Sequence, residues 1–188
     1  MSKDVEWAHP GALGLAGFGF NTILLQIHNC GLISGEVALL YGFFWGGMAQ
    51  VIAGIIEGRS GDSFGLTAFT SYGLFWIGLS FAFLMEWLDI VTLSNSGLAW
   101  AFILWGIFTA YMTIGTLRIS RVHVFIFSTL TILFFLLAAH FFNPEGFSAV
   151  IPGVEGIICG VSAVYASAAV VLNATHGRWI LPLGFPAK

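Results

Sequence analysis

The chain has 188 residues, of which 58% are hydrophobic and 8% are charged, with six Lys and Arg against nine Asp and Glu. Soluble domains carry about 25% charged residues, so most of this surface must face lipid rather than water. The composition therefore argues against a soluble enzyme, and the net charge of −3 argues against a protein that binds nucleic acid.

The hydrophobic residues gather in six segments, each of roughly the 20 residues that a helix needs to cross a bilayer. Short connectors rich in Gly, Ser, Asn and Pro separate these segments. We therefore predict an all-α membrane protein with six transmembrane helices per subunit, in a single domain over residues 1–188. The expected spans are residues 12–32, 37–56, 64–85, 97–117, 122–142 and 153–172.

The basic residues all fall on one side of this six-span arrangement. They are Lys3, Arg59, Arg118, Arg121, Arg178 and Lys188. The other side has only acidic residues, namely Glu36, Glu86, Asp89, Glu145 and Glu155. Because cytoplasmic connectors of membrane proteins are enriched in Lys and Arg, we expect a multi-pass protein of the inner membrane with both termini in the cytoplasm.

Small residues form two stripes along the expected helices. The second span has Gly42, Gly46, Gly54 and Gly58 at multiples of four residues, with Gln50 completing the series, and the sixth span has Gly153, Gly156, Gly160, Ala163 and Ser167. Such stripes let two helix backbones approach closely inside a membrane. The sequence leaves open whether each stripe faces the same chain or a neighbouring subunit.

Polar side chains inside the spans need partners or a water-filled cavity, so we consider them as candidates to line a pore. They are Asn21, Thr22, Gln26, His28, Asn29, Thr70, Ser71, Tyr165 and Asn173. For a single Ser or Thr, a hydrogen bond to its own helix is the simpler explanation.

Few ionisable groups lie within the spans. Glu57 and His28 are placed near opposite ends of their helices and are candidates for proton coupling, although snorkelling or helix capping explains Glu57 equally well. The histidines lack the spacing of a metal site, and Cys30 and Cys159 are interpreted as packing residues. We expect neither a metal nor a cofactor.

The segment HPGALGLAGFGFNTILLQIHN, at residues 9–29, carries a recognisable motif. It resembles the N-terminal signature of the acetate uptake transporter family, which reads N-P-A-P-L-G-L followed by x-G-F-G. The matching residues are Pro10, Leu13, Gly14, Leu15, Gly17, Phe18 and Gly19, whereas His9, Gly11 and Ala12 differ. The segment FGLTAFTSYG at residues 64–73 is also similar to the family, as are residues 115–117 with 121–122 and residues 159–165, so the resemblance covers nearly the whole chain.

This resemblance implies a homohexamer in the lipid bilayer, in which each subunit has its own path for acetate, related small monocarboxylates or succinate. It also implies a hydrophobic constriction made by residues that correspond to Phe18, Tyr72 and Leu130, with Ala163 facing the pore.

Two other classes of function are considered. An intramembrane hydrolase is disfavoured, because the sequence around Ser162 lacks the glycine that follows a nucleophilic serine. A channel for neutral small solutes or ammonium is the stronger alternative, since the candidate pore residues are mostly uncharged.

Overall fold

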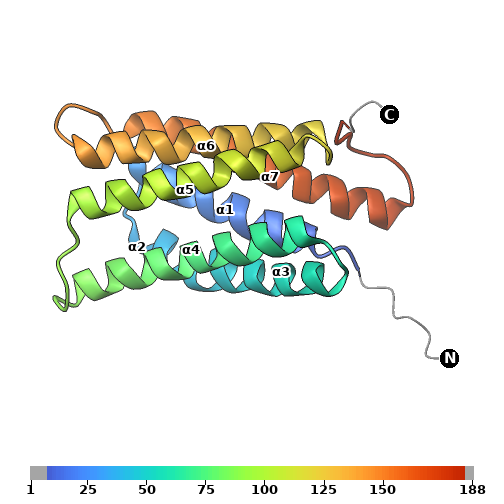
Figure 1. Cartoon of the computed structure of the whole chain (residues 1–188), viewed down its shortest axis with the longest axis horizontal. Coiled ribbons are helices and arrows are strands. Elements are labelled where there is room, and N and C mark those ends of the chain that lie inside the picture. The colour runs from blue at the N-terminus through green and yellow to red at the C-terminus, as the bar shows by residue number, and fades with distance from the viewer. Residues whose placement is uncertain (1–7, 185–188) are drawn as a thin grey trace.

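The computed structural model describes residues 8–184, and within this range all regular secondary structure is helical. The elements are α1 (Gly11–Asn29), α2 (Glu36–Tyr41), η1 (Gly42–Ala49), α3 (Gln50–Arg59), α4 (Ser63–Trp87), α5 (Asn95–Thr116), α6 (Arg121–Phe142) and α7 (Val150–His176). The long helices run side by side along one axis (Figure 1).

Five helical segments are long and apolar enough to cross a membrane, and α2, η1 and α3 together form one of them. The five are Glu36–Arg59, Ser63–Trp87, Asn95–Thr116, Arg121–Phe142 and Val150–His176. The sixth, α1, has 19 residues, which at about 1.5 Å per residue nearly matches the hydrocarbon thickness. Its Asn, Thr, Gln and His side chains make it more polar than the others. The expected class, an all-α membrane protein, is confirmed.

The helix ends follow ordinary capping chemistry. The Asp62 carboxylate accepts hydrogen bonds from the Phe64 and Gly65 backbone N–H groups at 2.8 and 3.0 Å and so starts α4. The first helix ends at Asn29 rather than at residue 32, because Gly31 adopts a positive φ of 75°. The last helix continues to His176 and ends at Gly177, whose φ is 62°.

The second membrane segment is not one regular α-helix. Its middle, η1, is an eight-residue π-helix. A π-helix bonds each N–H to the fifth carbonyl back, and such stretches are rare and often occur at functional sites. The expected spacing of four residues along this segment is thus interrupted where Gly42, Gly46 and Gly47 are buried.

Both glycine stripes face other helices of the same chain. A side chain at Gly46 would collide with Asn21 of α1, and one at Gly54 would collide with Thr70 of α4. In α7, a side chain at Gly156 would meet Gln26 of α1 at 2.5 Å. The glycines therefore let α1 lie close to both η1 and α7.

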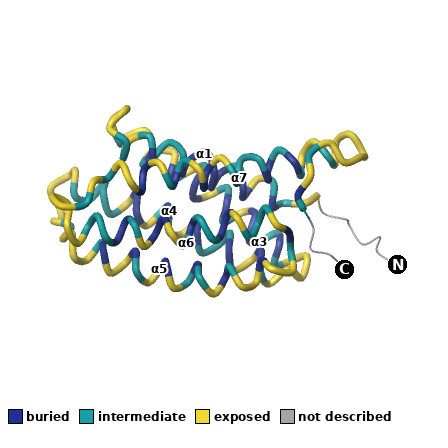
Figure 2. Tube along the Cα trace, turned by 90° about the horizontal axis from the view of Figure 1, so that it is seen from above, coloured by how far each residue is buried: buried dark blue, intermediate teal, exposed yellow. Residues whose placement is uncertain are grey.

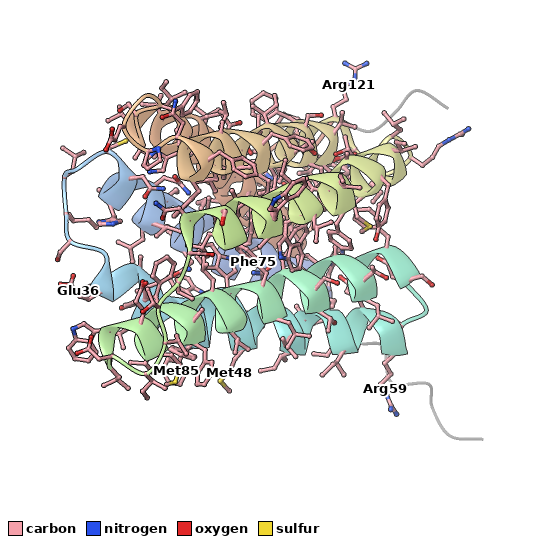
Figure 3. The ribbon with its side chains drawn as sticks, turned by 60° about the vertical axis from the view of Figure 1, so that its left-hand side comes forward. Glu36, Met48, Arg59, Phe75, Met85 and Arg121 are labelled. Atoms are coloured by element: carbon pink, nitrogen blue, oxygen red, sulfur yellow. The ribbon has the colours of Figure 1, made fainter. Side chains whose placement is uncertain are left out.

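The two ends of the helix bundle differ in charge. Arg59 and Arg121 lie at one end and Glu36 lies at the other (Figure 3). We call these the basic end and the acidic end. Lys3 and Lys188 lie outside the described residues.

The outer surface of the bundle carries many exposed apolar side chains. Phe44, Leu104 and Ile114, for example, are 65%, 65% and 68% exposed. Figure 2 shows that exposed residues alternate with buried ones along the helices, as expected when each helix has one face toward the interior. A surface of this kind suits lipid or a neighbouring subunit rather than water.

Candidate functional site: two cavities and the side chains between them

Two cavities penetrate the bundle from opposite ends. The acidic-end cavity has a volume of about 310 Å³ and reaches the α1–α2 connector at Gly35 and the start of α7 at Ala149. The basic-end cavity has a volume of about 360 Å³ and reaches Asp62 and Trp179. The two cavities therefore point along the direction in which the helices cross a membrane.

Among the described residues, three line both cavities: Phe18, Tyr72 and Leu130. They come from α1, α4 and α6 and are 7%, 4% and 3% exposed. The Phe18 and Tyr72 rings lie 6.1 Å apart between centroids. These three side chains form an apolar plug at the boundary between the cavities.

Glycines on either side of Phe18 bring its helix close to its neighbours. A side chain at Gly17 would collide with the Trp45 carbonyl oxygen, and one at Gly19 would meet the Gly160 carbonyl oxygen at 2.8 Å. Since no side chain larger than hydrogen fits at these positions, α1 is held between η1 and α7. The G-F-G sequence thus places Phe18 at a fixed depth.

Tyr72 is held by a hydrogen bond to α5. Its hydroxyl lies 2.8 Å from the Thr109 hydroxyl, which itself donates to the Trp105 carbonyl oxygen at 2.8 Å. Because the single Thr109 proton is used in that bond, Tyr72 is the donor in the first. The rings of Phe108 and Phe127 pack against Tyr72 edge-on, at 5.5 and 6.1 Å.

Four of the polar candidates line the acidic-end cavity, all from α1. They are Thr22, Gln26, His28 and Asn29. The Asn29 amide donates to Gln26 Oε1 at 2.8 Å, and His28 Nδ1 donates to the Ile33 carbonyl oxygen at 3.0 Å. The remaining wall is largely aromatic, with Phe75, Trp76, Phe83, Phe102, Phe134 and Phe141.

The basic-end cavity has a more ionisable wall. Glu57 and His9 line it, with His9 Nδ1 3.9 Å from Glu57 Oε1, and so do Asp62 and His123. Asn173 also lines this cavity, but its amide is used to fix the segment after α7. Its oxygen accepts from the Ile180 and Leu181 N–H groups, and its nitrogen donates to the Leu181 carbonyl oxygen.

The other candidates line neither cavity. Asn21 packs against Gly46, and Thr70 packs against Gly54, so both lie at helix contacts. Tyr165 donates to the Pro182 carbonyl oxygen at 2.8 Å. Ala163 is fully buried, and Ser71 is half-buried away from the cavities.

Two residues that contribute to the site, Thr109 and Gln50, were not among the pore candidates chosen from the sequence. In the sequence, Thr109 does not differ from the other threonines of the apolar spans. Its contact with Tyr72 is evident only in the folded structure. Gln50 stands in the glycine stripe, and its amide, a costly group inside a membrane, could have marked it as functional. Among residues 8–184, His, Cys, Asp and Glu side chains form no cluster able to hold a metal ion.

These features define an all-helical integral membrane protein with two internal cavities that meet at a plug of three side chains. The model of the GPR1/FUN34/yaaH family matches residues 2–185. The chain therefore belongs to the GPR1/FUN34/yaaH family, which confirms the resemblance noted in the sequence.

Known proteins resemble the chain over nearly its full length. The succinate-acetate/proton symporter SatP of Escherichia coli is 46% identical over 185 residues, covering 96% of this chain and 97% of that protein. A protein of Methanothermobacter thermautotrophicus is 42% identical over 184 residues, covering 93% and 90%. The solved structure of the bacterial acetate channel SatP matches with a TM-score of 0.92 and 44% identity, covering 95% of this chain and 100% of that one.

Proposed function

We propose that the protein is a membrane transporter or channel for acetate and related small monocarboxylates, with succinate as a further substrate to test, and that it is not an enzyme. The observation that carries this proposal is the meeting of the two cavities at Phe18, Tyr72 and Leu130. The names of the similar proteins, a succinate-acetate/proton symporter and an acetate channel, support the choice of substrate.

The apolar plug suits a small acid. Removing a carboxylate from water without new hydrogen bonds is costly, so a long apolar passage would exclude every anion. Here the apolar section is short, because polar groups of Thr22 and Gln26 lie on one side and Gln50 on the other. A small solute can therefore regain hydrogen bonds directly after it passes the three side chains.

We propose that the basic end faces the cytoplasm and that the protein lies in the inner membrane. Arg59 ends α3, Arg118 follows α5, Arg121 begins α6 and Arg178 follows α7. All four are at that end, in agreement with the positive-inside rule. We further propose a homohexamer, in which part of the exposed apolar surface contacts neighbouring subunits. Native mass spectrometry of the protein in detergent would test this assembly, and a monomeric mass would contradict it.

Glu57 and His28 are our candidates for proton coupling, since each lines one of the two cavities. If they carry protons with the substrate, acetate uptake should rise as the external pH falls, and Glu57→Gln or His28→Gln should flatten this dependence. Glu145→Gln is the matched control, because Glu145 is exposed in the α6–α7 connector. An unchanged pH profile in both cavity variants would contradict the assignment.

The proposed function is tested by an uptake panel in proteoliposomes with radiolabelled acetate, succinate, methylammonium and water. We expect saturable acetate uptake that unlabelled acetate suppresses. Uptake of methylammonium or water without acetate would instead indicate a channel for neutral solutes or ammonium. No flux of any solute would indicate a structural protein.

A further inference from the structure

Gln50 is a buried polar residue whose role is not explained by helix packing alone. It is 1% exposed, it begins α3, and it lines the basic-end cavity. Its neighbour Gly46 lies beside Asn21 of α1, and Gly47 lies against Gly73 of α4. Gln50 is therefore one turn from these contacts, near the depth of Phe18 and Tyr72.

The junction between η1 and α3 fixes the orientation of the Gln50 amide. The Gly46 carbonyl oxygen, which pairs with the Gln50 backbone N–H in a regular α-helix, accepts no hydrogen bond from the N–H groups that cap η1. The Gly46 carbonyl oxygen instead accepts a hydrogen bond from Gln50 Nε2 at 2.6 Å. A carbonyl oxygen can only accept, so the nitrogen must point to Gly46 and the amide oxygen must point elsewhere.

Gln50 Oε1 accepts no hydrogen bond from any residue between 8 and 184. The atom is also not completely enclosed by the protein. Because Gln50 lines the basic-end cavity, this oxygen is the group that the amide offers to a solute there. The second hydrogen on Nε2 remains available beside it. A solute with both a donor and an acceptor fits this amide.

Resting on the proposed function, we propose that Gln50 binds the substrate on the basic-end side of the plug and selects the protonated carboxylic acid over the carboxylate. The acid O–H donates to Gln50 Oε1, while the acid carbonyl accepts from Nε2. A carboxylate has no hydrogen to donate and would place its charge against the amide oxygen.

The charges around this cavity favour the same selection. Apart from Tyr72 of the plug, the titratable groups that line it are His9 before α1, Glu57 of α3, Asp62 before α4 and His123 of α6. Two of them are carboxylates, which repel an anion when ionised and leave a neutral acid unaffected.

The test uses two uncharged ligands of nearly the same shape. Acetamide carries N–H donors beside its carbonyl group, as the acid carries its O–H, whereas acetone has no donor. Binding is measured as ligand-dependent thermal stabilisation of the full chain in detergent. One hydrogen bond corresponds to about tenfold in affinity, so we expect the wild type to bind acetamide at least about tenfold more tightly than acetone.

Gln50→Met should bring this ratio close to one. Thr70→Val is the control, since Thr70 packs against Gly54 and lines neither cavity, and it should keep the wild-type ratio. A ratio near one in the wild type overturns the proposal, as does a wild-type ratio in Gln50→Met or a loss of the ratio in both variants. If Gln50→Met does not fold, the wild-type ratio decides the question.

These measurements are separate from the test of the proposed function. Acetate uptake in proteoliposomes can succeed while the wild type fails to distinguish acetamide from acetone, and then only the role of Gln50 is refuted. If acetate uptake is absent, the proposed function is refuted whatever the binding ratio.

Discussion

The Tyr72 hydroxyl of α4 donates a hydrogen bond to the Thr109 hydroxyl of α5 across 2.8 Å. Both residues are buried, Tyr72 being 4% and Thr109 0% exposed. The α4 and α5 backbones approach each other at few points, so this bond and ring contacts such as that between Tyr72 and Phe108 join the two helices at the level of the plug. Thr109 thereby positions Tyr72 without lining either cavity.

This bond predicts that two conservative substitutions differ in effect. Thr109→Val leaves the Tyr72 hydroxyl buried without a partner and should lower stability by about 1 to 3 kcal/mol. Tyr72→Phe leaves Thr109 bonded to the Trp105 carbonyl oxygen and should cost only about 0.5 to 1.5 kcal/mol. Thermal unfolding in detergent measures both, and the double variant should be no less stable than Thr109→Val. A larger loss in Tyr72→Phe than in Thr109→Val would contradict this account.

Two glycines provide a second comparison. A side chain at Gly17 would collide with the Trp45 carbonyl oxygen, whereas one at Gly78 would meet nothing within 4 Å. Gly17→Ala must therefore push α1 away from η1, at about 1 to 3 kcal/mol. Gly78→Ala should be neutral or stabilising by up to about 1 kcal/mol, because alanine favours the helix. The melting temperatures of the two variants test this difference in stability. Equal melting temperatures would argue against the close contact at Gly17.

The orientation in the membrane is tested with single cysteines in a chain whose Cys30 and Cys159 are replaced by alanine. Ser34 is exposed in the acidic-end connector and Ser60 in a basic-end connector. If the basic end is cytoplasmic, an impermeant thiol reagent added to intact cells should label Ser34→Cys and leave Ser60→Cys unlabelled until the cells are opened. Labelling of Ser60→Cys from outside would reverse the proposed topology.

The helical membrane fold was predictable from composition because long apolar segments leave few alternatives in a bilayer. The π-helix η1 was not predicted: its Gly46 and Gly47 lie against Asn21 of α1 and Ile77 of α4, and single-residue propensity does not encode such tertiary contacts. For a related reason, the sequence could not separate the polar candidates that line a cavity from those that lie at helix contacts. Thr22 and Asn21 are adjacent in sequence, yet one lines a cavity and the other packs against a glycine.

The three residues of the plug could not be predicted from the sequence pattern alone. Phe18, Tyr72 and Leu130 are apolar or aromatic residues in apolar helices, and no periodicity separates them from ordinary core residues. Only the family resemblance singled them out, and the structure brings all three to the boundary of the two cavities. Their role in selecting substrates remains a prediction.

That role is tested at Leu130. Leu130→Ala removes three carbons from the plug, and the surrounding helices, held by the Gly17 and Gly19 contacts, can close only part of the gap. Acetate should gain little from the wider path, whereas the bulkier lactate should gain most, so the ratio of lactate to acetate uptake should rise severalfold.

The matched control is Leu136→Ala, because Leu136 is half-buried on the same helix and lines neither cavity. It should lower stability and leave the uptake ratio unchanged. Ala163→Leu is informative for the same reason. The family resemblance places Ala163 in the pore, whereas the structure buries it completely outside both cavities, so we expect overpacking and loss of stability rather than a changed ratio. The decisive measurement is the ratio at matched protein level: if Leu130→Ala shows the wild-type value, Leu130 does not limit substrate size, whatever happens to the absolute rates.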